Sequence, residues 1–61
     1  MNDRALWGLA EVAEYASIGE TRARKLVSQP DFPVPVRLWD GAHPRWIARE
    51  VMDYCEARRA A

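Results

Sequence analysis

Hydroxyl-bearing and cationic side chains are concentrated in one short stretch of the sequence. The charged and hydroxyl-bearing residues of this stretch are Glu20, Thr21, Arg22, Arg24, Lys25 and Ser28. On a helix of about 100° per residue, Thr21, Lys25 and Ser28 point directly outward, flanked by Arg22 and Arg24. Arginine can bind guanine through two hydrogen bonds, and threonine can contact a thymine methyl group. The pattern predicts base and phosphate contacts in the DNA major groove, although an ordinary solvated helix face has the same composition.

A second group of basic side chains, Arg37, His43 and Arg45, lies in a stretch that predicts a β-hairpin. Strand-forming residues alternate over residues 36–39 and 45–47, with an Asp-Gly turn signal between them. A hairpin beside a DNA-binding helix can place cations on phosphates or in the minor groove. We expect phosphate contacts from Arg37 and Arg45, whereas His43 is equally well explained as a surface residue.

Apolar periodicity predicts the helices that would hold these side chains. The residues at i, i+3, i+4 and i+7 of the first apolar stripe are Leu9, Val12, Ala13 and Ala16. They predict a helix over Leu9–Ala16, with Gly8 as its N-cap. Glu11 stands at the third helical position, where a carboxylate interacts well with the N–H groups of the first turn.

A short break and a second helix follow the first helix. Ser17-Ile18-Gly19 predicts a tight turn, with Ile18 packed between the two helices. The second helix is expected from about Glu20 to Gln29, because Pro30 stops it. Its inward side includes Ala23, whose small side chain suits two helices that cross closely. The two helices and the turn have the layout of a helix-turn-helix.

The last segment predicts a third helix from about Ala48 to Arg59. Its inner side would carry Ile47, Val51, Tyr54 and the aliphatic part of Arg58. Further residues widen its apolar side beyond the needs of one small core, namely Ala48, Met52 and Cys55.

The hairpin must pack against the helices, because two strands alone are marginally stable. We expect Phe32, Val36, Leu38 and Trp46 to make this contact, whereas Trp39, beside the turn, stays a candidate platform for base stacking. The order helix, helix, β-hairpin, helix predicts the fold class: α+β, mostly α, a minimal winged helix-turn-helix. A single domain of this kind accounts for residues 1–61.

The chain carries nine basic and nine acidic side chains, so its formal net charge is zero. This balance counts against binding to nucleic acid by bulk attraction. Residues 1–16 carry one basic and three acidic side chains, residues 17–47 carry five and three, and residues 48–61 carry three of each. The positive excess coincides with the predicted DNA-contacting helix and hairpin.

The sequence shows no constellation typical of catalysis or of a bound cofactor. Cys55 and His43 are too few to fill a tetrahedral zinc site. Carboxylate pairs at i, i+3 spacing, such as Asp53 and Glu56, fall on helix faces expected to be solvated, without a cleft between them. We therefore expect a protein that is not an enzyme and holds neither a metal ion nor a cofactor.

The sequence also shows no targeting signal. The sequence shows neither a secretory leader nor an apolar stretch long enough to span a membrane. A single cysteine permits no internal disulfide. We expect a cytoplasmic, DNA-associated protein of a bacterial host cell, without membrane contact.

The most distinctive run of the sequence is FPVPVRL, residues 32–38, which is followed at short distance by Arg45-Trp46 and Glu50-Val51. With the helix-turn-helix residues before it, this run resembles the excisionase-like, MerR-type winged-helix domains. That family includes the AlpA-type phage regulators and the small phage excisionases. The resemblance extends from about Leu6 to Arg59.

The resemblance implies DNA binding through the second helix and the hairpin, or wing. Excisionases are recombination directionality factors that bind adjacent sites in a prophage attachment region, bend the DNA, and direct a tyrosine integrase toward excision. A chain of this size without an effector segment is more similar to them than to full MerR regulators. The implied partners are double-stranded DNA, a tyrosine integrase and further copies of this chain bound cooperatively.

Two departures from the family pattern affect these expectations. Many relatives have Gly at the position of Ser17 and Ser or Thr at the position of Gly19, so a side-chain N-cap is lost at a cost of only a few tenths of a kcal/mol. Relatives are often basic, whereas this chain is neutral. We therefore expect binding to depend on contacts between neighbouring copies. The candidate contact residues are Leu6, Trp7, Glu11, Glu14 and Met52.

Two alternatives share the same sequence features. A transcriptional regulator of phage genes would present the same helix and wing. A protein-interaction module on a winged-helix scaffold is the alternative of another class, and the zero net charge favours it.

Overall fold

The computed structural model describes residues 5–58, and its first two helices follow the predicted pattern. Helix α1 spans Leu9–Ala16 as predicted, whereas α2 spans Glu20–Val27 and ends two residues before the expected end at Gln29. Gly8 is the N-cap of α1, and its N–H donates a hydrogen bond of 2.9 Å to the Glu11 carboxylate. The predicted start signal of α1 is confirmed.

The turn between α1 and α2 depends on a left-handed residue. Ser17 adopts φ 59° and ψ 42°, and the next N–H, that of Ile18, donates to the Ala13 carbonyl at 3.0 Å. Ile18 is half-buried, so it fills the junction of the helices only in part. Ala23 is fully buried where α2 packs against α1, as its small side chain predicts.

The sheet differs from the predicted hairpin. Strand β1, Leu6–Trp7, pairs antiparallel with β2, Trp46–Ile47, so that Leu6 lies opposite Ile47 and Trp7 opposite Trp46. The expected strand over residues 36–39 is wrong, because only Val36 bridges Arg45, through hydrogen bonds of 2.6 and 3.0 Å. Residues 6–7 pair with the edge of β2 opposite to the Val36 bridge, and the sequence did not predict this partner.

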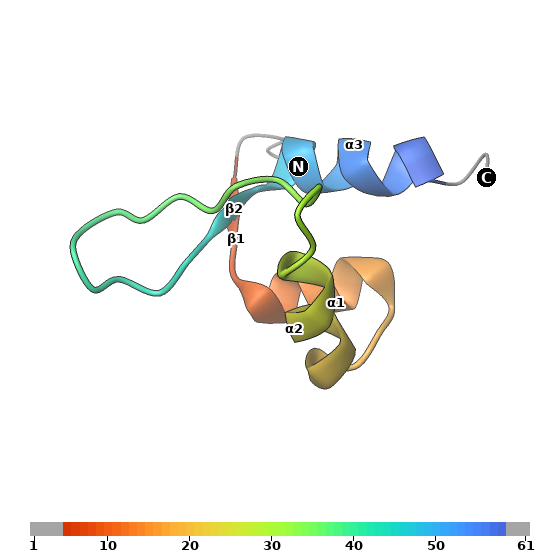
Figure 1. Cartoon of the computed structure of the whole chain (residues 1–61), viewed down its shortest axis with the longest axis horizontal. Coiled ribbons are helices and arrows are strands. Elements are labelled where there is room, and N and C mark those ends of the chain that lie inside the picture. Colours follow the sequence, from red (N-terminus) through yellow and green to blue (C-terminus); the bar gives the residue numbers. More distant parts are fainter. Residues whose placement is uncertain (1–4, 59–61) are drawn as a thin grey trace.

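Residues 37–44 form no further strand pairing beyond that bridge. The carbonyl of Ala42 accepts a hydrogen bond of 2.7 Å from the Arg37 guanidinium, and the Ala42 N–H donates to the Trp39 carbonyl at 3.0 Å. Residues 36–45 therefore form a long loop that projects from the body of the molecule (Figure 1). We call it the 36–45 loop.

The core joins all the helices through a few large side chains. Val12, Phe32, Trp46 and Val51 form its buried cluster, and the Phe32 ring meets those of Trp46 and Tyr54 edge to face. Phe32 and Trp46 confirm their predicted packing. The packing predicted for Val36 and Leu38 is only partly confirmed.

Val36 is half-buried, whereas Leu38 is 58% exposed, because it lies beyond the bridge in the projecting loop. The prediction that Ala48 widens the apolar side of the helix beyond the needs of the core is also wrong. Ala48 is fully buried at the start of α3, where its N–H donates to the Ala5 carbonyl. Met52 and Cys55 are half-buried, in keeping with their predicted place beside the core.

Helix α3 spans Ala48–Arg58, and the predicted last residue, Arg59, lies outside the described residues. Helix α3 lies on the opposite side of the molecule from α1 and α2 (Figure 1). Within residues 5–58 the chain forms a small α+β fold of three helices and a two-stranded antiparallel sheet. No helix in this range has the length and apolar character needed to cross a membrane.

Candidate nucleic-acid interface

Helix α2 is anchored by its apolar side and presents its polar side to solvent. Ala23 is fully buried, and Leu26 and Val27 pack half-buried against the core. All side chains predicted for the contact face of this helix are exposed, namely Glu20, Thr21, Arg22, Arg24, Lys25 and Ser28. The predicted outward face of α2 is confirmed.

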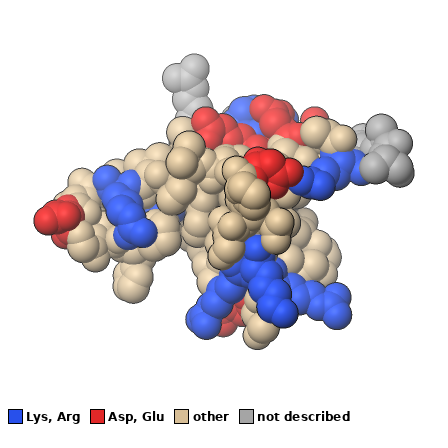
Figure 2. All heavy atoms as spheres, in the orientation of Figure 1, with Lys and Arg blue, Asp and Glu red and all other residues tan. Residues whose placement is uncertain are grey.

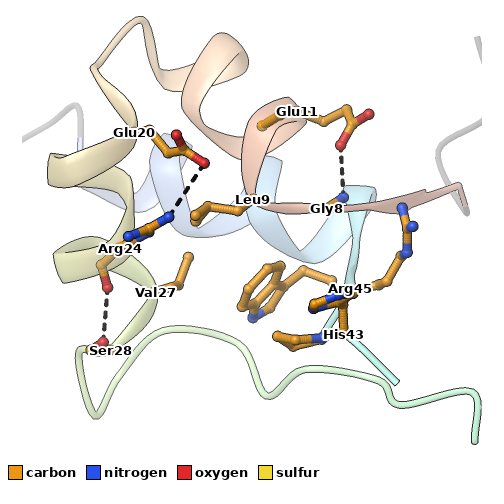
Figure 3. A pocket seen from close by; sticks show the side chains of 12 residues that line it. Gly8, Leu9, Glu11, Glu20, Arg24, Val27, Ser28, His43 and Arg45 are labelled. Carbon is orange, nitrogen blue, oxygen red and sulfur yellow. Dashed lines mark hydrogen bonds and ion pairs between the residues drawn. The ribbon is translucent and has the colours of Figure 1, made fainter. Parts of the chain in front are cut away.

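A groove of about 680 Å³ runs along one side of α2, between this helix and residues 43–46. Leu9, Val27 and Trp46 contribute apolar side chains to its lining. The predicted contact residues that line it are Glu20, Arg24, Ser28, His43 and Arg45. Figure 3 shows the α2 side chains on one side of it and His43 and Arg45 on the other. We call it the α2–loop groove.

A second groove, of about 380 Å³, lies on the other side of α2, next to the C-terminal half of α3. It holds the two remaining cations of the predicted helix face, Arg22 and Lys25, together with Tyr54 and Arg58 of α3. We call it the α2–α3 groove. Thr21 is exposed and lines neither groove. Helix α2 is therefore a ridge between two grooves, and it divides the predicted contact set between them.

The polar side chains of α2 make few hydrogen bonds or ion pairs within residues 5–58. Arg24 lies 3.7 Å from the Glu20 carboxylate, and both side chains are more than half exposed. The Ser28 hydroxyl donates to the Arg24 carbonyl at 2.8 Å. An exposed pair of this kind contributes about 0–1 kcal/mol, so Arg24 can exchange it for another anion at little cost. Arg22 and Lys25 make no ion pair or side-chain hydrogen bond within residues 5–58.

The three basic residues predicted for contact from the 36–45 loop differ in what they touch. Arg37 donates to the Ala42 carbonyl across the loop, and so part of its guanidinium braces the loop itself. His43 is exposed at the edge of the α2–loop groove. The Arg45 guanidinium lies against Gly8, where a Cβ atom would be 3.4 Å from its Nη1. Only His43 and Arg45 thus share a groove with α2.

The charges are unevenly spread over the surface. Figure 2 shows Lys and Arg side chains gathered over the α2 end of the molecule, whereas acidic and basic side chains are mixed along α3. On α3, Arg49 lies 2.7 Å from the Asp53 carboxylate and 3.7 Å from that of Glu56. The positive excess of residues 17–47 therefore lies on the same side as the exposed face of α2.

The sequence did not indicate a role for Arg58 at this surface. Its guanidinium is paired with the Asp31 carboxylate and lies 4.4 Å from the centre of the Tyr54 ring. Tyr54 donates a hydrogen bond of 3.3 Å to the same carboxylate. The i, i+4 spacing of Tyr54 and Arg58 is a weak signal of their contact. Asp31 is far away in the sequence, so its part in this contact had no local signal.

Cys55 shows no sign of an activated nucleophile. Burial raises the pKa of its thiol, and the nearby positive charge of Arg58 lowers it by a smaller amount. A raised thiol pKa keeps the protonated form dominant at neutral pH, and that form is a poor nucleophile.

Comparison of the chain with protein families, curated proteins and solved structures returned no match. The features that bear on function are the arrangement of the two grooves around α2 and the sequence pattern.

Proposed function

We propose that this protein binds double-stranded DNA in a sequence-specific manner, as a minimal winged helix-turn-helix. Helix α2 enters the major groove, and the 36–45 loop acts as the wing. The observation that carries the proposal is the exposed basic ridge of α2, which stands between two grooves. A helix with its side chains is about 10–12 Å across and fits a major groove about 12 Å wide.

The two grooves give the proposal its geometry. A helix in the major groove has a phosphate backbone on either side of it. Arg24, His43 and Arg45 lie along the α2–loop groove, and Arg22 and Lys25 lie along the α2–α3 groove. Each backbone would thus meet cations from a different groove, while Thr21 on the crest of the ridge faces the base edges.

Sequence-specific binding by this chain requires more than one copy. Each phosphate that a protein neutralises adds about −0.9 to the slope of log K against log salt, and a neutral chain offers few such contacts. We propose that copies bind side by side on adjacent sites, and that contacts between neighbours supply the missing affinity.

Gel shifts on duplexes selected from a randomised library test DNA binding. Arg22→Ala should weaken binding to DNA, because the Arg22 side chain is exposed and its removal breaks no ion pair or side-chain hydrogen bond within residues 5–58. Arg49→Ala is the matched control, because Arg49 belongs to α3 and lines neither groove. Equal affinity of the two variants, or a single non-cooperative complex, would contradict the proposal.

The more specific role that we propose is that of an excisionase in the bacterial cytoplasm. It is supported by the similarity of FPVPVRL, Arg45-Trp46 and Glu50-Val51 to the excisionase-like domains. In that role the protein binds tandem attachment-region sites, bends them and directs a tyrosine integrase toward prophage excision. An excision assay with the integrase of the same genome tests it. Excision that is independent of the protein, with promoter repression intact, would point to a transcriptional regulator.

A protein-interaction module on the same scaffold is the second candidate, and the zero net charge favours it. Such a module would show no salt-dependent binding to DNA. Charge reversal at Lys25 or Arg45 would leave its interactions unchanged, whereas the same substitutions would abolish binding to DNA.

A further inference from the structure

The 36–45 loop exposes two adjacent large apolar side chains. Leu38 is 58% exposed and Trp39 is 66% exposed, in a segment that projects away from the body of the molecule (Figure 1). The other two tryptophans contact the core, since Trp46 is 3% exposed and Trp7 packs half-buried beside it. The position of Leu38 and Trp39 in the loop is therefore not explained by folding.

Two hydrogen bonds brace the backbone around these two side chains. The Ala42 N–H donates to the Trp39 carbonyl at 3.0 Å, and Gly41 supplies the positive φ of 83° that the turn needs. Arg37 braces the loop through the Ala42 carbonyl. A braced loop has little freedom left to lose, so the ordering cost of inserting its tip into a partner is low.

The charges around Leu38 and Trp39 identify the kind of partner. The loop contains two arginines, Arg37 and Arg45, and one histidine, His43, against one acidic residue, Asp40. An apolar tip on a loop that carries arginines suits the minor groove, where proteins insert apolar side chains between base steps and place basic side chains near the phosphates. The loop and α2 also share the α2–loop groove, so a duplex that contacts α2 passes beside the loop.

We propose that Leu38 and Trp39 form an apolar wedge that enters the minor groove of duplex DNA beside the site of α2. There Trp39 stacks on a partly unstacked base pair, and the duplex bends toward its major groove. The inference rests on the proposed function, since it requires that α2 binds the same duplex. It assigns a role in DNA distortion to residues outside the cationic contact set.

The test compares Trp39→Ala, Trp39→Phe and Val34→Ala on a selected duplex of roughly 30 base pairs. Val34 is the matched control because it is 80% exposed but lies outside the 36–45 loop. Three quantities are measured: affinity, the distance between fluorophores at the duplex ends, and the emission of a fluorescent adenine analogue placed at successive steps.

Wild-type protein should bend the duplex by about 20–90° and raise the emission of the analogue at one step. Trp39→Ala should bind the duplex roughly tenfold more weakly, which is the loss expected when one base–aromatic stack is removed. The same variant should also lose the rise in emission at that step. Trp39→Phe should retain both, because phenylalanine can also stack. Val34→Ala should behave as wild type.

Two results would overturn the wedge alone. One is a Trp39→Ala variant that matches Val34→Ala in affinity and emission while Arg22→Ala still loses binding. In that case the wedge fails and the proposed function stands. The other is a Trp39→Ala defect that occurs only where several copies assemble, which would make the loop tip a contact with a second copy. Failure of the wild-type protein to bind any selected duplex would remove the proposed function and the wedge together.

Discussion

Ser17 holds a backbone conformation that glycine adopts more easily. Its φ of 59° lies in the left-handed region, which costs a residue with a Cβ atom about 1–2 kcal/mol. We expect Ser17→Gly to raise the free energy of unfolding by roughly 0.5–1 kcal/mol, since the greater freedom of glycine in the unfolded chain offsets part of the gain. Urea unfolding followed by circular dichroism measures this change.

Gly41→Ala is the control for that prediction. Gly41 has φ 83° and no atom within 4 Å of the position of a Cβ, so the substitution adds only backbone strain. We expect it to lower the free energy of unfolding by about 1 kcal/mol. A Ser17→Gly variant less stable than wild type would mean that the Ser17 side chain makes a stabilising contact.

The ionisation of Cys55 should make the free energy of unfolding decline at alkaline pH. Burial raises the pKa of its thiol in the folded state, and so the folded chain holds this proton more tightly than the unfolded chain. The associated stability is fully present below the unfolded pKa of about 8.5 and is lost as the pH rises through the folded pKa. Urea unfolding between neutral pH and pH about 10 should therefore show a steeper decline for wild type than for Cys55→Ala. Parallel declines would contradict the prediction.

At the scale of elements, the helices and strand β2 were predictable, whereas the partner of β2 was not. The stripe from Leu9 to Ala16, the Gly8 cap and the Pro30 stop are local signals, and they placed α1 and most of α2 correctly. The segments beside β2 are distant from it in sequence. Leu6–Trp7 pair with one edge of β2, and on the other edge residues 36–39, which have the composition of a strand, contribute only the Val36–Arg45 bridge. No local pattern reports how far such distant segments pair.

Strand β1 should therefore contribute strongly to stability. Trp7 pairs with Trp46 across the sheet, and its ring lies 5.1 Å from that of Tyr15. We expect Trp7→Ala to lower the free energy of unfolding by about 2–3 kcal/mol, a large share for so small a domain. Trp39→Ala removes the same side chain from an exposed site and should change stability by about 0.5 kcal/mol or less. Equal losses in urea unfolding would show that β1 does not depend on Trp7.

At the scale of the whole molecule, the exposed contact face was predictable but its division was not. Helical spacing alone places Thr21, Lys25 and Ser28 outward. It does not reveal that Arg24 faces the loop whereas Arg22 and Lys25 face α3, because both grooves are built from segments far from α2 in sequence. For the same reason, the sequence did not indicate the position of Arg58, which depends on Asp31 and on the packing of Tyr54.

The salt dependence of DNA binding counts the phosphates that each bound copy neutralises, because each contact releases counterions from the DNA. If Arg22, Arg24, Lys25 and Arg45 each neutralise one phosphate, the slope of log K against log salt is about −4 to −3 for each bound copy. Lys25→Ala should make that slope shallower by about 1 and weaken binding equally to all sequences. Anisotropy titrations over a range of salt concentrations measure both effects.

Thr21 gives the complementary expectation, because it stands on the crest of α2 and lines neither groove. Thr21→Ala should leave the salt slope unchanged and relax the preference for one base pair by about 1–3 kcal/mol. Arg49→Ala, on α3, should alter neither quantity. If Lys25→Ala and Arg22→Ala both gave the same slope as Arg49→Ala, the α2–α3 groove would hold no phosphate. The duplex would then contact α2 from the loop side alone, because Arg24, His43 and Arg45 line the groove on that side.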